Sequence, residues 1–140
     1  MTSDLSRFLD AQRRDYDTAL REIRSGRKRS HWMWYIFPQI QGLGFSSTAQ
    51  YYAIRDLKEA KEYLAHPVLG ARLKEITAAL LSLDRLSAHE IFGYPDDLKL
   101  RSCLTLFSLA APEETLFTKA LDKYYGGEPD SRTVQLAREL

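Results

Sequence analysis

The stretch "PDDLKLRSCLTLFSLA", residues Pro95–Ala110, decides the predicted fold. It is apolar on most sides when written as a helix, and such a helix is buried at the centre of a domain. Asp96 and Asp97 stand where acidic side chains commonly cap the first backbone amides of a helix. We therefore expect a central helix here, capped by one of the two aspartates.

Helices are also expected on either side of this segment. Asp4–Arg24 repeats apolar residues at helical spacing, with Ser3 as its expected cap and Gly26 as its stop. Other expected helix starts are Asp56 with Glu59 and Ser87 with Glu90 as capping boxes, Pro67 as a first helical residue, Glu113–Glu114, and Asp130. The sequence thus predicts a mainly α fold, a single compact helical domain over residues 1–140.

The segment Ser30–Ile54 is the irregular part of this prediction. Its density of aromatic residues favours a strand, whereas Pro38 disfavours helical geometry at Phe37. We expect a short helix before Phe37, an extended glycine turn at residues 42–44, and a second short helix from Ser46 or Ser47. Short strands within the segment stay open as an alternative.

Composition excludes several classes of protein. The chain has 140 residues, a net charge of +1 and no apolar run near the ~20 residues of a membrane helix, so we expect no membrane partner. Its one cysteine, Cys103, fits a reducing cytoplasm and is predicted to be an inert buried thiol. The three histidines are scattered, so neither a metal site nor a cofactor is expected.

The glycine turn is the first candidate binding element. Gly42 and Gly44 allow backbone amides to point into one concavity, and Ser46 adds a hydroxyl donor. Together these groups could hold a phosphate or a carboxylate. The alternative is a tight turn followed by an ordinary helix cap.

The aromatic run before the turn is the second candidate. Trp32, Trp34, Tyr35 and Gln39 combine ring faces with polar atoms, which suits a planar ligand such as a nucleobase. The alternative is that all these rings belong to the hydrophobic core.

Acid–base chemistry would come from His31, Asp96 and Asp97, with Lys99 and Ser102 on one face of the central helix as ligand-binding residues. Hydrolysis at a glycosidic carbon needs a positioned carboxylate and an oriented water, without a metal. A shared site requires the start of the central helix to lie beside the His31–Ser46 segment, and we predict that it does.

Three blocks, "HWMWYIFPQIQGLGFSS", "EAKEYLAHPVLGARL" and "FGYPDDLKLRSCLTLF", resemble those of a family of small bacterial and fungal proteins of unknown function. Some members carry the label calpastatin, which implies little because that inhibitor is a long disordered chain. The C-terminal segment is loosely similar in layout to proteins related to the riboflavin-biosynthesis N-glycosidases. This looser similarity implies a nucleotide-like ligand.

The leading hypothesis is a site for a nucleotide-like or other phosphate-bearing small molecule, with metal-independent hydrolysis of an N-glycosidic bond as a further hypothesis. One alternative is a nucleic-acid-binding module, because the segment Arg13–Arg29 contains seven basic residues and only three acidic ones. Another is a structural or partner-binding protein without a small-molecule site. The oligomeric state stays open.

Trp32→Ala should lower the free energy of unfolding more than His31→Ala. Truncating a buried tryptophan costs ~3–5 kcal/mol, whereas a histidine facing a cleft contributes much less to stability. Urea unfolding of both variants measures the difference. Equal midpoints well below that of the wild type would place His31 in the core and remove it from the acid–base candidates.

Overall fold

The computed structural model describes residues 4–139, which form nine helices and no regular strand. The helices are α1 Ser6–Arg24, α2 Met33–Ile36, α3 Ser47–Tyr51, α4 Leu57–Ala65, α5 Leu69–Leu81, α6 Ala88–Phe92, α7 Asp96–Ala110, α8 Thr115–Tyr125 and α9 Ser131–Glu139. The predicted mainly α fold is therefore confirmed.

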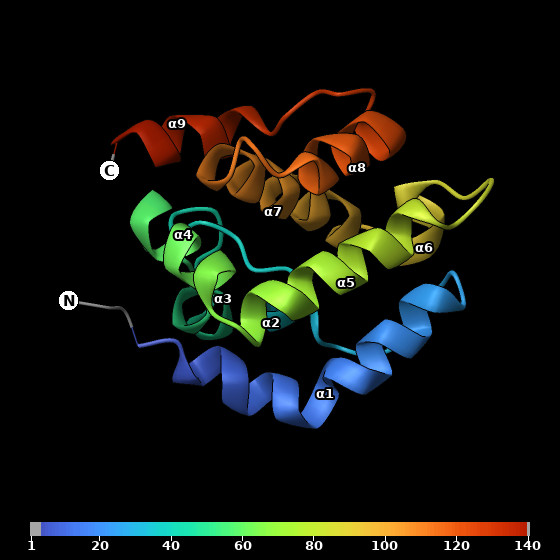
Figure 1. Cartoon of the computed structure of the whole chain (residues 1–140), viewed down its shortest axis with the longest axis horizontal. Helices are drawn as coiled ribbons and strands as arrows, with labels where there is room; N and C mark the ends of the chain where they lie inside the picture. The colour runs from blue at the N-terminus through green and yellow to red at the C-terminus, as the bar shows by residue number, and fades with distance from the viewer. Residues whose placement is uncertain (1–3, 140) are drawn as a thin grey trace.

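Helix α7 lies at the centre of the molecule, as its sequence predicts. It packs against α4, α6, α8 and α9, and its Leu100, Leu104 and Phe107 are fully buried. Figure 1 shows α8 and α9 on one side of α7, and α1 on the far side of α5. Four helices thus pack directly on α7, whereas α1 packs on α5 and α2.

The start of α7 differs from the prediction of an aspartate cap. The N-cap residue is Pro95, which offers no side-chain hydrogen bond, and Asp97 Oδ1 accepts only the neighbouring Leu98 N–H. The Asp96 carboxylate instead contacts Lys28 Nζ at 2.8 Å. A lysine from a distant part of the chain therefore binds the group that local sequence assigned to capping.

Several other helix ends follow local sequence closely. Ser87 and Glu90 form the predicted capping box, and Gly126 ends α8 in the left-handed conformation. Asp130 Oδ2 accepts the Thr133 N–H at the start of α9. The expected cap Ser3 lies outside the described residues.

Two predicted helix starts need correction. Asp56 accepts the Glu59 N–H, but the Glu59 side chain bonds to arginines instead of completing the box. Pro67 is not a first helical residue, because α5 begins two residues later at Leu69. His66 Nδ1 accepts the N–H of Leu69 there, so a histidine side chain helps to start the helix.

The irregular segment contains both predicted short helices, α2 and α3, and Ser46 caps α3. Its one strand-like feature among the described residues is an isolated parallel bridge between Ile40 and Ile54. Gln41 N–H donates to Ile54 O and Ile54 N–H donates to Gln39 O, both at 2.8 Å. These bonds close the base of a loop, residues 41–53, called the glycine loop below.

Gly42→Ala should destabilise the protein more than Gly126→Ala. Both glycines have positive φ. A Cβ at Gly42 would lie 3.1 Å from Leu136 Cδ2, whereas a Cβ at Gly126 would have no neighbouring heavy atom within 4 Å. We expect a loss of roughly 2 kcal/mol for Gly42→Ala and roughly 1 kcal/mol for Gly126→Ala. Denaturant unfolding tests the order, and equal losses would show that Leu136 moves aside without cost.

Candidate functional site

A hollow of about 320 Å³ lies between α2, the glycine loop and α7, and is called the Lys99 hollow below. Its wall includes six of the residues predicted from sequence as ligand-binding: Trp34, Gln39, Gly42, Gly44, Ser46 and Lys99. Ile40, Leu43, Phe45, Ala49, Tyr52 and Ala53 complete it. The structure thus brings the glycine turn, one tryptophan and the start of the central helix together.

Lys99 is the cation of this hollow. Its Nζ lies 4.9 Å from the centre of the Trp34 ring, where the π face attracts an ammonium group. Its second contact is Asp96 Oδ1 at 3.4 Å, and 27% of the side chain is exposed. Lys99 therefore faces the hollow while a ring and a carboxylate hold its position.

Asp96 is bound more closely by the other lysine. Lys28 Nζ lies 2.8 Å from Asp96 Oδ2, with only 8% of the Lys28 side chain exposed, and 5.0 Å from the centre of the Trp32 ring. Two ammonium groups thus share one carboxylate, which leaves one positive charge in excess within this group of three side chains. These contacts also confirm that the start of α7 lies beside the His31–Ser46 segment.

Glu22 on α1 fixes the chain that carries Lys28 and Trp32. Its carboxylate accepts hydrogen bonds from Ser30 Oγ at 2.6 Å, Arg29 N–H at 2.8 Å, Trp32 Nε1 at 2.9 Å and Ser30 N–H at 3.0 Å. Partial burial raises the pKa of this carboxyl, but the hydrogen bonds outweigh it and lower the pKa to about 2. The carboxylate therefore acts as a fixed acceptor for the whole turn.

Trp32 is consequently a core residue and not a wall of the hollow. Its side chain is 1% exposed and contacts Phe37 and Phe92 in the core. The ligand-binding role predicted for Trp32 does not fit this burial. It supports the site indirectly, because its ring lies beneath the Lys28 ammonium.

Tyr35 and His31 lie at a second, more open hollow, which shares Trp34 as a wall. The Tyr35 hydroxyl donates a hydrogen bond to the Asp15 carboxylate. Burial is the largest cause that raises the pKa of Tyr35 to about 12, and this hydrogen bond is the second. His31 is exposed at that hollow and is not among the residues that line the Lys99 hollow. Trp34 and Tyr52 line both hollows, whereas neither Tyr35 nor His31 lines the Lys99 hollow.

Asp97 and Ser102 also point elsewhere. Asp97 Oδ2 lies 3.4 Å from His89 Nδ1, on the side of α6. Ser102 is buried, and its hydroxyl donates to Leu98 O within α7. Lys99 and Ser102 share a helix, but only Lys99 reaches the hollow.

Sequence reasoning missed Tyr52, Phe45 and the individual role of Lys28. Tyr52 contacts Tyr35 with ring centres 5.0 Å apart and lines both hollows. Phe45 is 80% exposed on the rim of the Lys99 hollow. The sequence did contain one signal for Phe45. It is an aromatic residue among glycines and serines, and no helical or strand periodicity requires an apolar residue there.

Other predicted features stay apart from this site. Burial raises the pKa of the Cys103 thiol well above its ordinary value, in agreement with an inert core cysteine. Within residues 4–139, no three His, Cys, Asp or Glu side chains are grouped so that they could hold a metal ion. In the same part of the chain, no helix has both the length and the apolar character needed to cross a membrane.

These features define an all-helical domain with a small hollow formed by a lysine, aromatic rings and a glycine loop. The chain belongs to a family of proteins of unknown function, DUF1810, whose sequence model matches residues 2–137. It is similar to the conserved hypothetical protein Rv1873 from Mycobacterium tuberculosis, with 50% identity over 96% of each chain and a TM-score of 0.95 to its crystal structure. No curated protein matches the sequence. Neither the calpastatin label nor the likeness to N-glycosidases appears in these matches.

Glu22→Gln should destabilise the protein at neutral pH by about 1–2 kcal/mol, because four donors lose a charged acceptor. The folded pKa is about 2, below the ordinary 4.5. The contribution of Glu22 is therefore complete above pH 4.5 and is lost as pH falls toward 2.

Urea unfolding of wild type and variant between pH 7 and pH 3 measures this dependence, with the exposed Glu113→Gln as control. The difference between wild type and Glu22→Gln should shrink toward acid pH. A difference that stays constant to pH 3 would contradict the assignment.

Proposed function

We propose that the Lys99 hollow binds a small phosphate-bearing, nucleotide-like molecule. The observation that carries this proposal is the position of Lys99, whose ammonium faces the hollow while the charge of Asp96 is already balanced by Lys28. An anionic ligand would meet one uncompensated positive charge. A phosphate accepts strong hydrogen bonds from such an ammonium group.

The opposite wall suits the same kind of ligand. Gly42, at φ +105°, turns the backbone around the hollow, and Ser46 Oγ accepts the Ala49 N–H while its own O–H can still donate. Helix α3 has five residues, so its dipole contributes little. The anion-binding groups are therefore the Lys99 ammonium, the Ser46 hydroxyl and the loop amides.

The planar part of the ligand would lie against aromatic rings. Trp34 and Tyr52 line the hollow, and Phe45 stands exposed at its rim. The volume of about 320 Å³ is at the lower end of the range for small-molecule pockets, which favours a ligand of mononucleotide size.

The proposal concerns binding and not hydrolysis, because the acid–base candidates do not converge. Asp96 is held between two ammonium groups, Asp97 faces His89, and His31 lines the second hollow. A general base must reach the attacking water beside the ligand. None of these three side chains has that position.

A nucleic-acid partner is less well supported. Arg13 Nη1 lies 3.7 Å from Asp10 Oδ1, and Arg14 Nε lies 3.2 Å from Asp15 Oδ2. These carboxylates offset part of the positive charge of the Arg13–Arg29 segment. Binding of a phosphate backbone needs a continuous excess of positive charge. The excess charge at the Lys99 hollow is suited to one anionic group.

Lys99→Gln should weaken the binding of adenosine 5′-monophosphate by about tenfold or more, because the ligand loses its charge-assisted hydrogen bond. Isothermal titration calorimetry measures the affinity, and Lys119→Gln, an exposed lysine on α8, is the matched control. Adenosine without the phosphate should bind more weakly than the monophosphate. Equal affinities for wild type and Lys99→Gln, or no binding by the wild type, would contradict the proposed function.

A further inference from the structure

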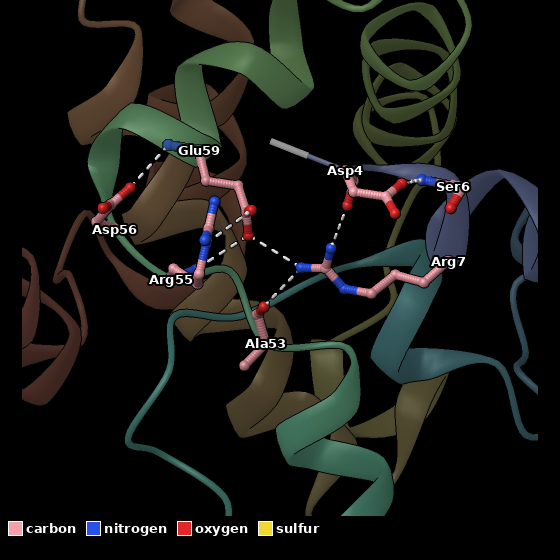
Figure 2. Close-up of polar contacts among 7 residues, drawn as sticks. All are labelled: Asp4, Ser6, Arg7, Ala53, Arg55, Asp56 and Glu59. Carbon is pink, nitrogen blue, oxygen red and sulfur yellow. Dashed lines mark hydrogen bonds and ion pairs between the residues drawn. The ribbon is translucent and has the colours of Figure 1, made fainter. Parts of the chain in front are cut away.

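Glu59 is a buried carboxylate outside the Lys99 hollow. It lies on α4 with 1% of the residue exposed, and its oxygens accept hydrogen bonds from two arginines. Arg7 Nη2 donates to Oε1 at 2.9 Å, Arg55 N–H to Oε1 at 3.1 Å, and Arg55 Nε to Oε2 at 3.2 Å. Figure 2 shows the carboxylate between the two guanidinium groups.

Arg7 extends this cluster to the glycine loop. Besides Glu59, its Nη2 donates to Ala53 O at 2.9 Å, and its Nη1 donates to Asp4 O at 2.7 Å. Its guanidinium also lies 4.4 Å from the centre of the Phe8 ring. One arginine thus joins the start of α1, the end of the glycine loop and α4.

Ala53 connects the Glu59–Arg7 cluster with the proposed site, because Ala53 accepts a hydrogen bond from Arg7 and lines the Lys99 hollow. The next residue, Ile54, forms the bridge with Ile40 that closes the loop. Helix α3, which lies within the loop, has no buried residue. The loop wall is therefore held largely at its two ends, and Arg7 and Glu59 hold the returning end.

We propose that Glu59 is a positioning residue for the Lys99 hollow, acting through Arg7 on Ala53; this inference rests on the proposed function. Removing the Glu59 charge leaves the Arg7 guanidinium, whose side chain is only 16% exposed, without its carboxylate, whereas Arg55 is 63% exposed and stays in water. Arg7 then loses the partner that holds its Nη2 against Ala53 O. The loop wall shifts, and ligand affinity falls although Glu59 never touches the ligand.

The experiment compares Glu59→Gln and Arg7→Met, which keeps an unbranched side chain beside Phe8 but removes the guanidinium, with Leu73→Ala as a matched control. Leu73 is buried on α5 and does not line the hollow, so its truncation lowers stability without touching the loop. Two quantities are measured on folded protein: the affinity for adenosine 5′-monophosphate, and the hydrogen exchange of the Gln41 and Ile54 amides.

Glu59→Gln and Arg7→Met should each weaken the affinity by at least about threefold and speed exchange of both amides, relative to amides of α7. Their double variant should lose less than the product of the two single losses, since both act through one contact. Leu73→Ala should leave the affinity of the folded protein unchanged.

Three results would overturn this inference. Unchanged affinity in Glu59→Gln, alongside weakened binding in Lys99→Gln, would remove the positioning role and leave the proposed function standing. An equal loss of affinity in Leu73→Ala would show that Glu59 acts only through global stability. Absence of Lys99-dependent binding in the wild type would overturn both the proposed function and the positioning role.

Discussion

The ion pair between Lys28 and Asp96 is the contact on which the geometry of the site depends. It joins the turn after α1 to the first turn of the central helix, and its lysine is almost fully buried. Loss of Asp96 would leave the nearly buried Lys28 ammonium without its carboxylate, which is strongly destabilising. Because Asp96 is bound by Lys28, Lys99 can face the hollow and rest on Trp34.

The hollow has two walls that are positioned by independent polar clusters. Glu22 orders the turn that carries Lys28 and Trp32, and thereby the α7 side. Glu59 and Arg7 hold the returning end of the glycine loop on the other side. Both clusters centre on a carboxylate that accepts several donors, and the proposed preorganisation of the hollow rests on them.

Local sequence was sufficient to predict those helix ends that are marked by capping residues. The box at Ser87 depends on Glu90, three residues further on, and it was predicted correctly. Site residues were harder to assign because α2 has only four residues and offers no period. Nothing local separates Trp32, which is buried, from Trp34, which lines the hollow. Lys28 and Asp96 lie far apart in the sequence, so local capping rules could not anticipate their contact.

The most direct test of the account is a two-dimensional ¹H–¹⁵N NMR titration of the wild type with adenosine 5′-monophosphate. We expect saturable shifts of the Gly42, Gly44 and Ser46 amides and of the Trp34 indole N–H, because these residues line the Lys99 hollow. The Trp32 indole N–H, which donates to Glu22, should move little. Absence of saturable shifts, or shifts confined to the basic Arg13–Arg29 segment, would contradict binding at the Lys99 hollow.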